Sequence, residues 1–310
     1  PQGIACKKVL EGVIKAEQLQ KGYKEFFCAD PLHGAKSLFN IYKAQKKPKA
    51  LPYRFCQDMV RENDDSEGLF QVRHSSSSVQ YTYTEPSKIQ QELISSLHFM
   101  KQMANILNIE SSFLLLQRGK DDVSSLVSAL KSAGYPFEIR RSDATQIELH
   151  AFDQRLRSWP ISKLTLMYEQ DSCIECVAVL SYERLLAIML EKEEGFLPFW
   201  LAPLQIRLLP VEQETMRWSE EFAKKLTLDG FRVDIDMRST PLGERMYQAS
   251  LQKAACAVVI GKKELGKQEL RVRFLPQSAE STSMSVTQFI EKIRVEGKAT
   301  LESESRDSSS

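Results

Sequence analysis

The sequence predicts an α/β protein with two domains, an α+β domain over residues 1–194 and an α/β domain with a mixed sheet over 195–296, followed by a tail at 297–310. A linker rich in proline and aromatic residues at 195–203 runs directly into an apolar segment at 204–209, which predicts the division. Beyond it, helical patterns alternate with short apolar strands, which favours a mixed sheet covered by helices. A chain of 310 residues is long enough for each domain to bury its own core.

The composition argues against a membrane-spanning chain and leaves nucleic-acid binding open. Charged residues make up 27% and hydrophobic residues 42%, which is ordinary for a soluble globular protein. Lysine and arginine (42) nearly cancel aspartate and glutamate (41), so any basic surface must be local. No apolar run approaches the roughly 18 residues that a membrane span requires.

Six cysteines are scattered along the chain, mostly in apolar surroundings, as expected of reduced thiols in a cytoplasmic protein. Cys173 and Cys176 form a single C-x-x-C pair, whereas a structural zinc site needs four ligands, so a metal or redox role is disfavoured. Because the chain begins at Pro1 rather than at methionine, we expect a trimmed product. An organellar location is the alternative if a targeting peptide was removed.

The first domain mixes helices and strands. The clearest helix is expected at 88–107, where Ile89, Leu93, Leu97 and Met100 lie along one face. In chain order, the patterns predict a helix at 5–22, a strand at 23–29, a hairpin over 54–83 with its polar turn at 62–68, the helix at 88–107, strands at 112–117, 137–141, 146–151 and 162–168 around a helix at 122–133, and a strand followed by a helix across 174–190.

The second domain alternates strands and helices. In residues 231–237 apolar and charged residues alternate, which predicts a strand with one buried and one charged face. The full order is a strand at 204–209, a helix at 214–228 closed by Gly230, the strand at 231–237, a helix at 243–254, a buried strand at 256–260, an edge strand at 269–275 and a helix at 285–294. The Glu/Ser-rich tail at 297–310 is expected to be disordered.

Four motifs of the second domain resemble a known family. They are WLAPLQ at 200–205, GFRVDIDMR at 230–238, LGER at 242–245 and VIGKKE at 259–264. In this order and spacing they resemble the anticodon-binding domain shared by threonyl-, prolyl-, histidyl- and glycyl-tRNA synthetases. The linker before them is similar to the hinge between the catalytic and anticodon-binding domains of a class II synthetase.

The first domain resembles the catalytic core of the threonyl enzyme more faintly. Residues 51–73 look like motif 2, residues 178–190 like motif 3, and residues 23–31 like a shortened motif 1. The resemblance covers nearly the whole chain. It implies a class II synthetase-like core built on an antiparallel sheet, and a homodimer formed through this domain.

The resemblance implies three cations for an ATP site. Arg61 falls where motif 2 supplies an arginine to the α-phosphate, Arg73 matches a second motif 2 arginine, and Arg184 matches the motif 3 arginine on the γ-phosphate. Negative charge develops on the phosphate in the transition state, which is why such cations accelerate adenylation. The alternative is that Arg61 and Arg184 are ordinary ion-paired residues beside Glu62 and Glu183.

The remaining positions depart from the pattern of an active synthetase. Ser75 stands where a phenylalanine would stack on adenine, and residues 180–184 lack the glycine of motif 3 and carry the bulky Tyr182. The strand at 161–165 lacks the glutamine of the amino-acid pocket. We therefore expect no aminoacylation activity, with ATP and Mg²⁺ as ligands only if the core is active.

The zinc site of the threonyl family also cannot be assembled at its usual positions. One Cys and two His hold that zinc with one open coordination position. The histidine positions fall at or beside Tyr81 and near Glu175, and the cysteine position at Cys28 or Asp30. We therefore expect no metal and no cofactor.

Seven residues of the second domain are candidates for RNA binding. They are Arg238, Ser239, Arg245, Lys263, Glu264, Arg271 and Arg273. The carboxyl ends of neighbouring strands converge, which favours one site, and unstacked bases need cations together with fixed donors and acceptors. The resemblance implies Arg238, Ser239, Glu264 and Arg273 as the base-reading group. Ser239 replaces an asparagine and Tyr247 lies near an expected arginine, so the resemblance leaves open which anticodon would be read. The alternative to an RNA-binding site is that these charged residues form a solvated rim.

Three functions remain. The favoured one is a threonyl-tRNA synthetase-like pseudoenzyme that binds tRNA, another RNA or a translation-related partner through its second domain. The second is an active, divergent threonine–tRNA ligase. The third is a scaffold or accessory subunit that binds no RNA, because one fold can host many functions.

Overall fold

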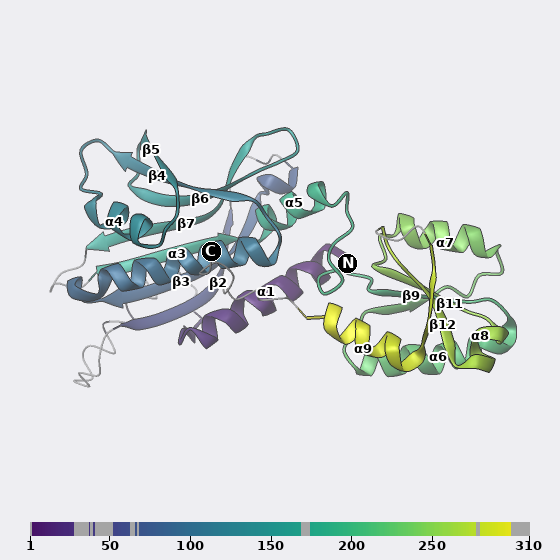
Figure 1. Ribbon diagram of the computed structural model, residues 1–310. Helices are drawn as coiled ribbons and strands as arrows, with labels where there is room; N and C mark the ends of the chain where they lie inside the picture. The colour runs from purple at the N-terminus through teal and green to yellow at the C-terminus, as the bar shows by residue number, and fades with distance from the viewer. Residues whose placement is uncertain are drawn as a thin grey trace, which may run out of the picture. The chain divides into compact units, whose positions relative to one another are not determined.

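The computed structural model describes residues 2–27, 37, 40, 52–62, 66, 68–168, 174–276 and 280–298. The chain divides into two compact units. We call Leu10–Lys192 the eight-stranded unit, and Glu193–Thr300 together with Pro1–Val9 the five-stranded unit. The fold class predicted from the sequence is confirmed: each unit combines helices with one sheet (Figure 1).

The sheet of the eight-stranded unit has the order β1-β2-β3-β8-β7-β6-β4-β5. It is antiparallel except at its outer pairs, where β1 runs parallel to β2 and β4 parallel to β5. Its strands are β1 (Lys24–Glu25), β2 (Tyr53–Glu62), β3 (His74–Thr84), β4 (Ser111–Arg118), β5 (Phe137–Ser142), β6 (Gln146–Phe152), β7 (Ser158–Tyr168) and β8 (Ile174–Ser181).

Helices cover one face of this sheet. They are the part of α1 (Gln2–Gln20) from Leu10 onward, α3 (Ile89–Ile106), α4 (Ser124–Ser132) and α5 (Tyr182–Lys192), with short 3₁₀ turns at Gly68–Phe70 and Pro86–Lys88. The helix α3 runs across the sheet (Figure 1) and buries the face predicted for it. Gln18 of α1 donates to the Ser78 hydroxyl of β3, and the Tyr23 and Thr82 hydroxyls share a hydrogen bond of 3.0 Å. Because side chains alternate along a strand, odd-numbered β3 residues such as Ser75 face the other way.

The five-stranded unit contains a mixed sheet of order β10-β9-β11-β12-β13. The strands β10, β9 and β11 are mutually parallel, and β12 and β13 add in antiparallel fashion. Its elements are β9 (Ile206–Pro210), α6 (Gln213–Leu228), β10 (Val233–Ile235), α7 (Leu242–Leu251), β11 (Cys256–Ile260), α8 (Lys262–Lys267), β12 (Glu269–Phe274), β13 (Thr282–Ser285) and α9 (Val286–Glu296).

The helices of this unit form two layers around the sheet (Figure 1). On one face α7 packs Ala249 and Met246 against Leu209 and Val259. On the other face α6 and α9 meet through Phe222 and Phe289, whose ring centroids are 6.3 Å apart. Loops therefore emerge at the strand ends, where the carboxyl ends of the three parallel strands share one edge.

Two sequence predictions for this unit were wrong. The strand at 231–237 is only Val233–Ile235, and its alternation stops there: Asp236 is 2% exposed and Met237 43% exposed. The reason is that arginine side chains pair with the Asp236 carboxylate inside the unit. The strand expected at 269–275 is not an edge, because β13 pairs along its other side.

Other predictions concern the helices and the cysteines. No helix among the described residues is long and apolar enough to cross a membrane. Cys6, Cys56, Cys176 and Cys256 are buried free thiols, and burial raises the pKa of each. The positions Cys28, Asp30 and Cys173 lie outside the described residues, as do residues 28–29 of the strand predicted at 23–29 and the tail from 299 onward.

Candidate functional site

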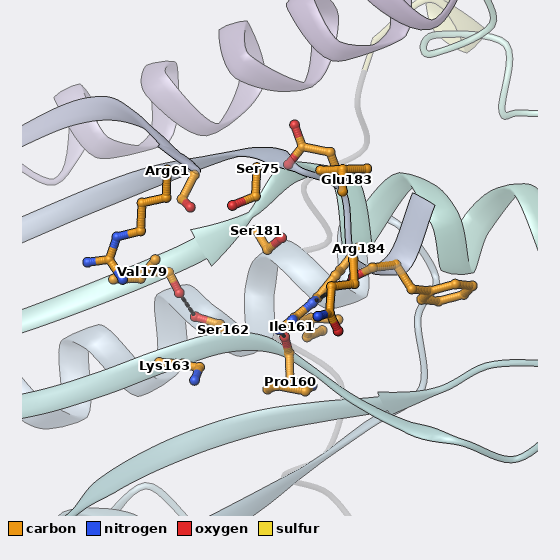
Figure 2. A pocket seen from close by; sticks show the side chains of 14 residues that line it. Arg61, Ser75, Pro160, Ile161, Ser162, Lys163, Val179, Ser181, Glu183 and Arg184 are labelled. Atoms are coloured by element: carbon orange, nitrogen blue, oxygen red, sulfur yellow. Dashed lines mark hydrogen bonds between the residues drawn. The ribbon is translucent and has the colours of Figure 1, made fainter. Parts of the chain in front are cut away.

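A pocket of about 310 Å³ lies on the eight-stranded sheet. Strands β2, β3, β7 and β8 and the start of α5 supply its walls, and Figure 2 shows Arg61 and Arg184 on opposite sides of the serines. The polar lining consists mainly of four serines and three cations: Ser75, Ser77, Ser162, Ser181, Arg61, Lys163 and Arg184. Such a lining suits a small anionic ligand.

The structure brings two of the three predicted ATP-site arginines to this pocket. Arg61 lies on β2 opposite Ser75, and Arg184 lies in the first turn of α5. Arg73 is not among the lining residues; its side chain is 71% exposed and lies 3.4 Å from Glu62. The resemblance had placed all three in one site.

Arg184 is held by backbone rather than by a carboxylate. Its Nε donates to the Phe70 carbonyl at 3.1 Å and its Nη1 to the Pro160 carbonyl at 2.8 Å. Its guanidinium also lies 5.9 Å from the centre of the Trp159 ring, and burial lowers the pKa of Arg184. The neighbouring Glu183 accepts hydrogen bonds from the backbone and hydroxyl of Ser76 instead. Arg184 thus clamps the chain segments beside the pocket.

A buried carboxylate stands behind the third cation. Glu148 on β6 lies 3.1 Å from the Lys163 ammonium and 2.7 Å from Nε2 of His150. His150 in turn contacts the Ser158 hydroxyl at 2.7 Å. Burial raises the pKa of Glu148, but the His150 hydrogen bond and the Lys163 charge outweigh it and bring the pKa to about 2.

Two of the positions that correspond to the family's zinc ligands, Tyr81 and Glu175, make other contacts in the fold. Tyr81 packs its ring 6.0 Å from that of Phe26, within a buried aromatic cluster. Glu175 accepts a hydrogen bond from the Tyr83 hydroxyl at 2.7 Å. A phenol packed among aromatic rings is no substitute for an imidazole ligand. In the described part of the chain, no three His, Cys, Asp or Glu residues group closely enough to hold a metal.

The residues predicted to bind RNA lie mostly at one edge of the five-stranded sheet. Arg238 and Ser239 follow β10, and Lys263 and Glu264 follow β11, so both pairs emerge at the carboxyl ends of parallel strands. Glu264 lies 3.2 Å from Arg271 on β12. Ser239 and Lys263 are exposed, as is Arg271.

Two of the seven residues lie differently. Arg273 is half-buried on β12 opposite Ala257, farther along the strand from this edge. Arg245 is 4% exposed and donates to the carbonyls of Pro210 and Asp236, at the ends of β9 and β10. Its guanidinium therefore ties two strand ends together from within.

A buried carboxylate outside the seven predicted residues organises this edge. Asp236 accepts from Nε of Arg238 at 2.9 Å and from its Nη2 at 2.6 Å. It also lies 3.7 Å from Arg207 and 3.6 Å from Arg245. The Arg238 hydrogen bond is the main cause that holds the pKa of Asp236 at about 2, against burial. An arginine inside an apolar strand, at Arg207, was the sequence signal for a buried acidic partner.

The chain is similar in sequence to known proteins, in its second domain and over most of its length. Residues 205–296 match the anticodon binding domain model. The threonine–tRNA ligase of Caldanaerobacter subterraneus subsp. tengcongensis is 22% identical over 94% of this chain and 56% of its own length. The threonine–tRNA ligase of Oleidesulfovibrio alaskensis is 28% identical over 75% of this chain and 42% of its own. Residues 205–296 thus belong to an anticodon-binding domain, and the chain is similar to threonine–tRNA ligases over most of its length.

Solved structures agree on the fold of this synthetase-like chain. The RNA binding domain of threonyl-tRNA synthetase from Cryptosporidium parvum Iowa II superposes with a TM-score of 0.85 at 18% identity, covering 96% of this chain and 92% of that one. Prolyl-tRNA synthetase from Cryptosporidium parvum gives 0.70 at 13% identity, over 95% and 69% of the two chains. The chain spans about half the length of the curated relatives it matches. All seven predicted RNA-binding residues fall within the matched anticodon-binding segment.

Proposed function

We propose that this threonyl-tRNA synthetase-like chain binds tRNA or another RNA through its anticodon-binding domain and does not catalyse aminoacylation. The observation that carries the RNA half is the Arg238 guanidinium, which stands half-exposed at the shared strand edge with Ser239 beside it. Exposed Lys263 and Arg271 add cationic side chains farther along the same sheet, where Arg271 pairs with Glu264. Cations of this kind bind phosphates, and fixed polar groups read unstacked bases.

Three features support the loss of catalysis. Ser75 offers no ring for adenine to stack on, although it lines the pocket. Tyr182, in the segment where the family has a glycine-containing turn, is buried at the start of α5. Its hydroxyl donates a hydrogen bond to Asp58. Two N–H donors of Arg184 are already hydrogen-bonded to backbone carbonyls, so fewer donors remain for a phosphate.

Equilibrium binding of fluorescently labelled bulk tRNA tests the RNA half. We expect log affinity to fall linearly with log salt concentration, because phosphate neutralisation releases counterions. We expect Arg238→Ala combined with Arg273→Ala to weaken binding by about tenfold or more, since base and phosphate contacts contribute roughly 1–3 kcal/mol each. Arg217→Ala, at an exposed arginine on α6, is the matched control and should change little. Unchanged binding in the double variant would overturn the proposed surface.

One observation favours the second function, an active and divergent threonine–tRNA ligase. Arg61, Lys163 and Arg184 line one pocket, and such cations stabilise charge developing on a phosphate. Amino-acid-dependent ATP–pyrophosphate exchange separates the two functions. If the chain is instead a scaffold that binds no RNA, a pull-down would retrieve protein partners but no RNA.

We further propose that the chain is cytoplasmic and forms a homodimer through the eight-stranded unit. Sedimentation of the purified chain would test the homodimer.

A further inference from the structure

We infer that Asp236 is a positioning residue for RNA: it grips one edge of the Arg238 guanidinium and so presents the opposite edge to a pair of acceptor atoms on the nucleic acid. The inference rests on the proposed function and deepens it. It names the residue that orients the contact and the chemistry that the contact selects.

The hydrogen bonds identify which edge is occupied. Asp236 Oδ1 accepts from Arg238 Nε at 2.9 Å and Oδ2 accepts from Nη2 at 2.6 Å, so a planar fork meets a planar carboxylate side on. The backbone N–H of Arg238 donates to the same Oδ1 at 3.1 Å. A guanidinium carries five N–H donors in fixed directions. The two hydrogens of Nη1 and the outer one of Nη2 therefore point away from Asp236, on a side chain that is 44% exposed.

The carboxylate itself is held on its other sides. Its backbone N–H donates to the Leu208 carbonyl at 2.9 Å, which fixes the chain just beyond β10. Arg207 from β9 and Arg245 from α7 approach it at 3.7 and 3.6 Å, and both arginines are buried. Buried ion pairs with several partners lock a side chain in one orientation because breaking one of them leaves a buried charge. Asp236 is thus a rigid support for the half-exposed Arg238.

Arg238 is the member of this cluster that reaches solvent. Arg207 also pairs with the exposed Asp234, and the Glu244 carboxylate acts on Arg238 electrostatically. The three guanidiniums, Arg207, Arg238 and Arg245, therefore face three carboxylates. The free edge of its fork matches two acceptors side by side, which RNA offers as phosphate oxygens or as O6 and N7 of guanine.

A double-mutant cycle on RNA affinity tests the coupling. The variants are Asp236→Asn, Arg238→Lys and both together, measured with fluorescently labelled bulk tRNA. We expect each single change to weaken binding about tenfold and the double change to be no worse than Arg238→Lys alone, because lysine keeps the charge but has no fork to orient. Asp234→Asn, which removes the exposed carboxylate near Arg207 but not the grip on Arg238, should stay within about twofold. Additive losses would overturn the inference.

A second readout needs no RNA and covers the case in which Asp236→Asn fails to fold. In ¹⁵N spectra of the wild-type full chain, the Arg238 guanidinium should show hindered rotation and slow Hε exchange, in contrast to the exposed Arg217. A freely rotating Arg238 overturns the positioning role even if tRNA binds. Conversely, a wild-type chain with a hindered Arg238 that binds no tRNA refutes the proposed function and, with it, the RNA role of this residue.

Short single-stranded RNAs distinguish the two acceptors. If phosphate is the partner, Arg238→Lys weakens binding of a uridine 12-mer and of a guanine-containing 12-mer equally. If guanine is the partner, the loss is confined to the guanine-containing strand. No loss with either strand contradicts the inference.

Discussion

At the scale of single residues, each of the two candidate sites lies beside a buried carboxylate that has more than one basic partner. The two are Glu148 beside the pocket and Asp236 beside the strand edge. Each has a pKa of about 2, well below its ordinary value. Such a carboxylate stabilises the fold only while it is ionised.

Glu148 should therefore make the eight-stranded unit sensitive to acid. Its folded pKa of about 2 lies below the ordinary 4.5, so its contribution is complete above pH 4.5 and is lost as pH falls toward 2. We expect Glu148→Gln to destabilise the unit by on the order of 2 kcal/mol at pH 7 and by much less at pH 3. Hydrogen exchange of the β6 and β7 amides at each pH measures this loss of stability. The control variant is Glu138→Gln, which changes an exposed glutamate. A difference from wild type that is the same at both pH values would rule out this contribution.

The sequence could indicate some of these residues and not others. The resemblance implied Arg61 and Arg184 in one site, and both line the pocket; their catalytic roles stay predictions. Asp236 was assigned to a charged, exposed strand face, because alternation is a local signal. Its burial depends on Arg207 and Arg245, which lie in other elements and are brought near only by the sheet.

At the scale of elements, the long helices followed from periodicity, whereas strand neighbours did not. The helix α3 matches its expected range closely because its apolar face repeats over eighteen residues. The strand β13 was missed since TSMS has no apolar alternation, and its pairing with β12 is what removes β12 from the sheet edge. Sheet order is a non-local property that single segments do not carry.

The helix α9 begins with a capping box that should contribute measurably. The Ser285 hydroxyl accepts from the Gln288 backbone at 3.2 Å, and the Gln288 side chain accepts from the Ser285 backbone at 2.9 Å. We expect Ser285→Ala to cost about 1 kcal/mol, because it leaves an orphan N–H at the helix start. Faster hydrogen exchange of the α9 amides is the readout, with Ser283→Ala on exposed β13 as the control. Equal protection in wild type and Ser285→Ala would mean that the box does not stabilise α9.

At the scale of the whole molecule, the chain joins a unit with an eight-stranded sheet to an anticodon-binding domain. Composition alone could not suggest RNA, because the formal net charge is only +1. The motifs of 200–264 carried that inference instead. We propose a division of labour, in which the five-stranded unit binds RNA and the eight-stranded unit performs no chemistry.

Amino-acid-dependent ATP–pyrophosphate exchange tests this account most directly. The full chain is assayed with each of the twenty amino acids, with an active threonine–tRNA ligase at the same concentration as the positive control. The account predicts no exchange above the protein-free blank with any amino acid. Exchange that depends on threonine, or on any other amino acid, and that disappears in Arg61→Ala would contradict it and establish the pocket as a working adenylation site.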